Sequence, residues 1–93
     1  MTTYHATVAD ANEAALELRR QIDAARILIA RLVPDVAAIV RAASDEVEIW
    51  WVPAHTGFCG MEIPSEYMVR AVADMAAPAP INIPGAHRCE IVW

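Results

Sequence analysis

The sequence predicts an α+β fold because two hydrophobic periods follow one another along the chain. From residue 11 to residue 43, apolar residues recur at steps of four and three, which indicates one face of a helix. After Ser44 the period becomes two, which is typical of a strand. The chain has 93 residues and no recognisable interdomain linker, so we expect one domain over 1–93.

The first predicted element is a long N-terminal helical segment. Asp10 is a good N-cap residue and marks its start. Pro34 lacks a backbone N–H and disfavours helical backbone at Val33, so the segment should break near Pro34 into helices over 10–32 and 34–43. Apolar residues lie on nearly all sides of the second half of the longer helix, and such a helix needs burial on nearly all sides.

The predicted sheet begins with residues 46–52, "EVEIWWV". Successive side chains of a strand point to opposite faces. Val47, Ile49 and Trp51 therefore share one face, and Trp50 lies on the other.

Three more elements complete the predicted fold. Residues 58–63 can return as the hairpin partner of the first strand, after the turn residues of "PAHTG". Ser65 is a suitable N-cap for another helix, which the "APAP" of residues 77–80 ends. Residues 87–93 give a final strand, and the sheet is expected to be small and mostly antiparallel.

An alternative arrangement adds a strand at the start of the chain. Residues 2–8, "TTYHATV", place Tyr4, Ala6 and Val8 on one face of such a strand. The order would then be β-α-β-β-α-β, the ferredoxin-like arrangement. Seven residues do not decide between the two arrangements.

Composition narrows the classes of partner and the compartment. The chain has 12 acidic and 7 basic side chains, and all the basic residues are Arg. We expect no nucleic-acid partner, because phosphate binding depends on clustered Lys and Arg. The most apolar run, 27–40, is too short and too polar to span a membrane, and the N-terminus does not resemble a signal peptide. We therefore expect a cytoplasmic protein with two free thiols and no membrane partner.

Two patches, "AHTGFC" and "AHRC", hold residue types that bind zinc. These residues are His55, Cys59, His87 and Cys89. A metal- or thiol-dependent protein that uses this cluster is the alternative function. However, the spacings H-x3-C and H-x-C do not match those of structural zinc sites. We therefore expect no metal and no other cofactor, with both cysteines buried as small apolar residues and His55 exposed in a turn.

The sequence also predicts a protein interface with two regions. Trp50 faces away from Val47, Ile49 and Trp51, and tryptophan is frequent at binding hot spots, although helices or the N-terminal segment could instead cover that face and bury it. The second region is the apolar surface between Ile22 and Val33. A hydrophobic fraction of 57% exceeds the roughly 45 to 50% usual in soluble domains, and the excess needs a partner surface. The predicted interface residues are Trp50, Ile22, Ile29, Leu32 and Val33.

These observations favour a small non-enzymatic protein that acts by binding another protein. No motif for a nucleophile or a phosphate-binding loop is recognisable, so we assign no catalytic residue. The Arg-only, Ala-rich composition is typical of a GC-rich bacterial genome. Together with the small size and the acidity, it suggests a phage or mobile-element accessory protein that binds a host protein. We also expect a homo-oligomer, most simply a two-fold dimer with the helices in the interface.

Overall fold

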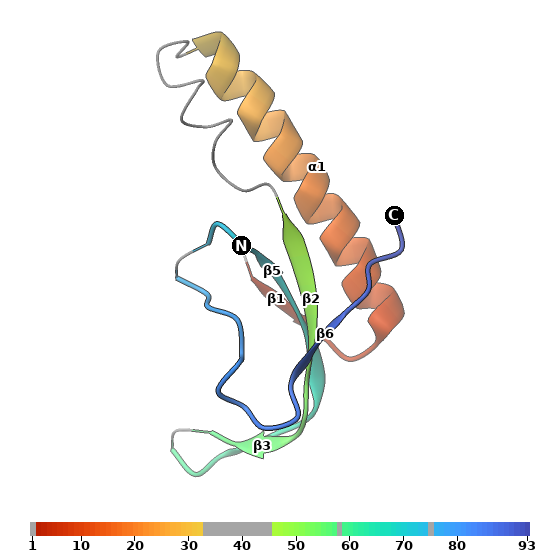
Figure 1. The fold of residues 1–93 in the computed structure, drawn as a ribbon, viewed down its shortest axis with the longest axis vertical. Helices are drawn as coiled ribbons and strands as arrows, with labels where there is room; N and C mark the ends of the chain where they lie inside the picture. The colour runs from red at the N-terminus through yellow and green to blue at the C-terminus, as the bar shows by residue number, and fades with distance from the viewer. Residues whose placement is uncertain (1, 33–45, 58, 75) are drawn as a thin grey trace.

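The computed structural model describes residues 2–32, 46–57, 59–74 and 76–93, and in them one long helix packs on a four-stranded antiparallel sheet (Figure 1). The strand order is β1-β5-β2-β6, and β3 pairs with β4 in a separate two-stranded sheet. The predicted α+β class is confirmed. The elements are β1 (Thr3–His5), α1 (Val8–Leu32), β2 (Val47–Val52), β3 (His55–Thr56), β4 (Glu62–Ile63), β5 (Glu66–Ala71) and β6 (His87–Cys89).

Helix α1 begins at Val8, two residues before the predicted start, because Thr7 caps it. The Thr7 hydroxyl accepts a hydrogen bond from the backbone N–H of Asp10 at 3.2 Å. The prediction that Asp10 is the N-cap is therefore wrong. Asp10 lies in the first turn instead, where its carboxylate is favourable beside the positive end of the helix dipole.

The N-terminal half of α1 forms the core with the sheet. Ala11 and Ala15 are 0% exposed and belong to the predicted apolar stripe. Their small side chains allow the helix to approach the sheet closely, and they cluster with Val47, Ile49 and Val69. Partly buried residues packed around this cluster are Ala14, Leu18, Ile22, Tyr67, Cys89 and Ile91.

The C-terminal half of α1 projects beyond the sheet (Figure 1). Along the stripe, Ile22 and Ile29 are half-buried and Leu32, the last residue of the helix, is exposed. The structure describes α1 as far as Leu32, so the predicted end of the helix at residue 32 stays a prediction. The predicted break near Pro34 and the predicted helix over 34–43 lie outside the described residues.

Strand β2 alternates between the two faces of the sheet as predicted. Val47 and Ile49 are buried in the cluster beneath α1, and Trp51 lies on the same face. Trp50 lies on the opposite face. The loop over 76–86 runs along that opposite face (Figure 1), so the sheet lies between the helix and this loop.

Residues 66–71 form strand β5, so the helix predicted to begin at Ser65 is wrong. β5 is a central strand and pairs with both β1 and β2. Tyr67, Val69 and Ala71 face α1, whereas Met68 and Arg70 face the loop. This period of two suits a strand with neighbours on both sides.

The return strand predicted over 58–63 is also wrong in its pairing. Of its described residues 59–63, only Glu62–Ile63 is a strand, and it pairs with β3 and not with β2. The partner of β2 is β5, with Val52 opposite Glu66 and Val47 opposite Ala71. Strands β2 to β5 therefore form one long hairpin with an interruption in it.

Two prolines account for that interruption. Pro53 directly follows β2, and Pro64 lies two residues before β5. Both prolines therefore lie just beyond the last pair of the β2–β5 ladder, Val52 and Glu66. Proline has no N–H to donate to a ladder, and both strands lose their pairing there. The ladder resumes as β3 and β4, which turn away from the main sheet (Figure 1). Gly60, with φ of +76°, closes the turn between them.

The two ends of the chain each add an edge strand. β1 lies within the 2–8 segment in which a strand was considered, and it pairs with β5. β6 pairs with β2 but ends at Cys89, earlier than the predicted 87–93. The tail beyond it lies against α1, where the Asn12 side chain holds Val92. The Asn12 amide nitrogen donates to the Val92 carbonyl at 2.9 Å, and its oxygen accepts from the Val92 N–H at 2.8 Å.

Candidate protein-interaction site

The projecting half of α1 carries an exposed apolar patch. Ile27 and Leu28 are each 56% exposed and Leu32 is 71% exposed. Leu28 and Leu32 are four residues apart and neighbour each other on the helix surface, and Ile27 lies about 100° around the helix from Leu28. We call these three residues the α1 patch. Large apolar side chains grouped on a surface are typical of protein contact sites.

The α1 patch overlaps only in part with the interface residues predicted in this region. Leu32 belongs to both sets. Ile22 packs against the core cluster beneath the helix, and Ile29 is half-buried. Val33 lies outside the described residues. The predicted set followed the apolar stripe, and Ile27 and Leu28 lie off it. The sequence feature that could have identified Ile27 and Leu28 is the lack of polar residues on the side of the helix opposite the stripe.

Trp50, the other predicted contact, is half-buried on the face of the sheet that carries the loop. Met68 on β5 and Arg88 on β6 are its cross-strand neighbours. Its indole Nε1 is buried and has no hydrogen-bond partner among the described residues. Because the side chain is only half-exposed, it offers less surface to a partner than the exposed residues of the α1 patch.

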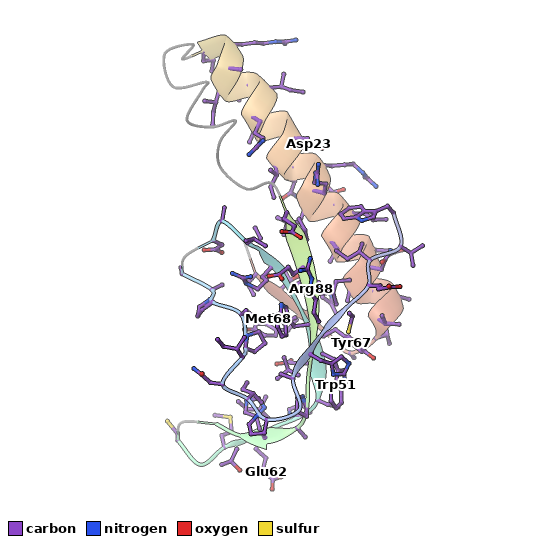
Figure 2. The ribbon with its side chains drawn as sticks, viewed as in Figure 1. Asp23, Trp51, Glu62, Tyr67, Met68 and Arg88 are labelled. Atoms are coloured by element: carbon purple, nitrogen blue, oxygen red, sulfur yellow. The ribbon has the colours of Figure 1, made fainter. Side chains whose placement is uncertain are left out.

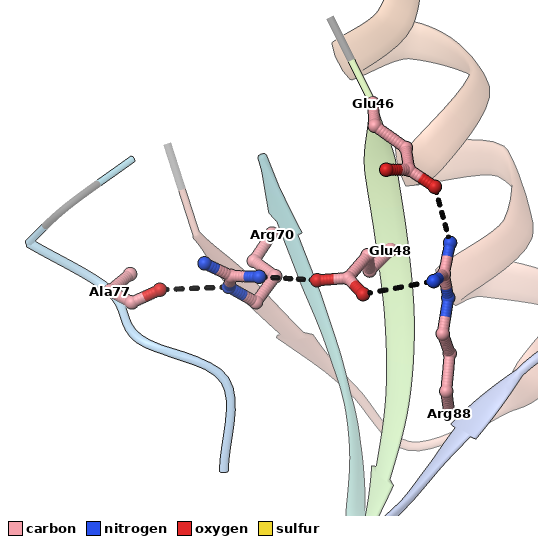
Figure 3. Close-up of polar contacts among 5 residues, drawn as sticks. All are labelled: Glu46, Glu48, Arg70, Ala77 and Arg88. Carbon is pink, nitrogen blue, oxygen red and sulfur yellow. Dashed lines mark hydrogen bonds and ion pairs between the residues drawn. The ribbon is translucent and has the colours of Figure 1, made fainter. Parts of the chain in front are cut away.

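Beside Trp50, an ionic network joins three strands (Figure 3). Arg70 on β5 donates to the carboxylate of Glu48 on β2, and both side chains are buried. Arg88 on β6 reaches Glu48 at 3.3 Å and Glu46 at 2.7 Å. The pKa of Arg88 is raised, mainly by its hydrogen bond to Glu46.

The same network attaches the loop to the sheet. Arg70 Nε donates to the Ala77 carbonyl at 2.8 Å (Figure 3). The guanidinium therefore uses one N–H for the carboxylate and another for the loop backbone, which suits its planar fork of donors. These charged groups hold the fold together at the face opposite α1.

A cleft of about 510 Å³ lies between this loop and the sheet. The titratable side chains in its wall are Tyr4, His55 and Glu66. His55 Nδ1 is 2.9 Å from the Pro53 carbonyl, which accepts its hydrogen bond. The rest of the wall is mainly apolar and includes Thr2, Val52, Ile63, Met68, Ala76, Ala77, Pro78, Pro80 and Ile83.

The structure does not gather the His/Cys set into one site. His55 lies on β3 of the small sheet, whereas His87 and Cys89 lie on β6 of the main sheet. Within the described part of the chain, no group of three or more His, Cys, Asp or Glu residues is placed to hold a metal ion. Two expectations are wrong: Cys59 is exposed, not buried, and His55 is half-buried in a strand.

Comparison with known proteins gives no further assignment. A scan against protein-family models, a search of curated proteins and a search of solved structures each found no match to this chain. Within residues 2–32 and the other described segments, no helix combines the length and the hydropathy needed to cross a membrane.

Proposed function

We propose that this chain is a non-enzymatic protein-interaction module that binds through the α1 patch. The observation that carries the proposal is the exposure of Ile27, Leu28 and Leu32 on the half of α1 that projects beyond the sheet. Burying these side chains against a partner would stabilise the complex by about 25 cal/mol for each Å² of apolar surface removed from water.

The first partner in this proposal is a second copy of the chain. Two projecting helices that meet at a two-fold axis would cover both patches at once, because a two-fold interface uses the same surface of each subunit. The charged side chains of the projecting half favour an antiparallel contact. Asp23 precedes the patch and Arg31 lies within it, so antiparallel helices centred on Ile27 bring opposite charges to the same level.

The second partner is a host protein. The Arg-only composition, the small size and the acidity support a phage or mobile-element accessory protein acting in the cytoplasm of a GC-rich bacterium. Such a protein acts by occupying a surface of a host factor. The α1 patch is the surface that would make that contact.

Site-specific photocrosslinking in the bacterium that carries the gene tests this proposal. A photoreactive residue in place of Leu28 should give covalent adducts, either with a second copy or with one discrete host protein. The matched control places the same residue at Glu17, which is also exposed on α1 but lies in the half beside the sheet. The same adducts from both positions, or none from Leu28, would contradict the proposal.

A further inference from the structure

Four ring side chains occupy one rung of the sheet, one on each strand. His5 on β1 is paired with Tyr67 on β5, Tyr67 with Trp51 on β2, and Trp51 with His87 on β6. Directly paired residues of an antiparallel sheet point to the same face. This face is the one that carries α1. We call the four residues the aromatic row.

The row lies at the end of the sheet where α1 begins. The next rung, with Val69 and Ile49, is buried beneath the helix, whereas Trp51 and Tyr67 are half-buried and His87 is exposed. Tyr67 packs against the core cluster that includes Ala11 of the helix, and Figure 2 labels Tyr67 and Trp51 close together at this end of the sheet. Trp51, Tyr67 and His87, with Cys89, line a recess of about 210 Å³.

The rings of the row are held in place before any partner arrives. The Trp51 and His87 rings lie 5.3 Å apart between centroids, with an angle of 39° between their planes. His87 Nδ1 is 3.2 Å from the Gly85 carbonyl, and His5 Nε2 is 2.7 Å from the Thr3 hydroxyl. A site with pre-positioned side chains loses less entropy on binding.

The chemistry of the row fits an extended proline-rich peptide. Such peptides adopt a polyproline II helix, which has no internal hydrogen bonds and docks its rings between aromatic side chains. The Trp51 indole N–H and the Tyr67 hydroxyl can donate to the free carbonyls of that backbone. The recess has no carboxylate or amide in its wall to bind sugar hydroxyls. The acidity of the chain disfavours a nucleic-acid base.

The charges around the row favour a basic flank on the peptide. Residues 2–18, which include β1 and the first half of α1, contain no Lys or Arg. Asp10 and Glu13 are exposed on the first turns of α1, and Glu90 follows β6. We propose that the aromatic row binds a proline-rich segment of a partner protein that carries Arg or Lys beside its prolines. This surface is distinct from the α1 patch.

Fluorescence anisotropy with two labelled probes tests the inference. The first probe is the peptide Arg-Arg-(Pro)8, and the second is Arg-Arg-(Gly-Ser)4, which has the same length and charge but no polyproline II preference. Saturable binding of the first probe, at least tenfold tighter than that of the second, is expected. Equal binding of both probes, or no saturable binding of the first, would overturn the proposal.

Variants then locate the binding. Trp51→Ala should weaken binding of the proline probe about 30-fold, as expected for a hot-spot residue. The control Trp93→Ala removes the exposed tryptophan of the C-terminal tail and should leave binding within about twofold. Should Trp51→Ala not fold, as judged by circular dichroism, the exposed His87→Ala variant serves instead, with a loss of about tenfold. Unchanged binding by the folded variants would overturn the proposal.

Two further measurements test whether the peptide binds the α1 patch instead, and whether a second copy of the chain occupies the aromatic row. Leu28→Arg should leave binding of the proline probe unchanged, because it alters only the α1 patch. Loss of probe binding in the Leu28→Arg variant would show that the peptide binds the α1 patch, and would overturn the inference. If Trp51→Ala changed the mass measured by light scattering, the row would be a contact with a second copy, whose own "APAPINIP" loop would be the occupant.

Discussion

Arg70 and Glu48 form a buried ion pair at directly opposed positions of the two central strands. Each side chain also has a second partner, since Arg70 donates to the loop at Ala77 and Glu48 pairs with Arg88. A buried charge is costly unless it is paired and hydrogen-bonded. This pair therefore ties the loop, β5, β2 and β6 into one structure.

The first prediction concerns this ion pair. Arg70→Ala leaves the Glu48 carboxylate buried with a weaker partner, and we expect the free energy of unfolding to fall by about 3 to 5 kcal/mol. The control is Arg88→Ala, which removes a half-exposed side chain and should cost only about 0 to 1 kcal/mol. Urea unfolding followed by circular dichroism measures both. Equal losses for the two variants would show that burial does not set the strength of this network.

The second prediction concerns the clamp on the C-terminal tail. Asn12→Ala removes both hydrogen bonds to Val92, and the expected cost is about 1 to 2 kcal/mol in the free energy of unfolding. Asn82→Ala, at an exposed loop position, should change it by less than about 0.5 kcal/mol. Amide hydrogen exchange gives a second readout, because the Val92 N–H should lose its protection only in the Asn12 variant.

The third prediction concerns the close approach of α1 to the sheet. Ala15 is fully buried against the strands, so Ala15→Leu should overpack the contact and cost about 1 to 3 kcal/mol. Ala30→Leu makes the same change at an exposed position of the same helix. Because Ala and Leu have similar helix propensities, the control should stay close to the wild-type stability. A thermal melt that shifts equally in both variants would contradict this packing.

The sequence could predict the elements whose evidence lies within a short stretch of chain. The apolar stripe of α1 is visible in its own residues, and the structure has a helix over Val8–Leu32. The alternation of Val47, Ile49 and Trp51 likewise set the faces of β2 correctly. Both patterns depend only on neighbours along the chain and on burial of one face.

The error at β5 shows what such local patterns leave out. Ser65 and the spacing of Glu66 and Arg70 are favourable for a helix, yet Arg70 pairs with Glu48, 22 residues away. The gain from two strand partners and from a buried ion pair outweighs the helical preference. The alternation of Tyr67, Val69 and Ala71 was the available signal for a strand.

The candidate site was predictable only in its general location. The excess of apolar residues near the end of the long helix indicates an interface, and Leu32 is one of the predicted interface residues. The sequence does not show where the sheet ends beneath the helix. That position decides which helix residues stay exposed, so they could not be predicted. The aromatic row was missed for a similar reason, because four strands distant in the sequence supply its rings.

The most direct test of the proposed function is the mass of the protein in solution, measured by light scattering after size-exclusion chromatography at about 100 µM. The account predicts about twice the chain mass of 10.2 kDa for the wild type and the single-chain mass for Leu28→Arg. Ala54→Arg adds the same charge at an exposed position between β2 and β3, away from α1, and should keep the doubled mass. A wild-type protein with the mass of one chain, or a Leu28→Arg variant that keeps the doubled mass, would contradict self-association through the α1 patch.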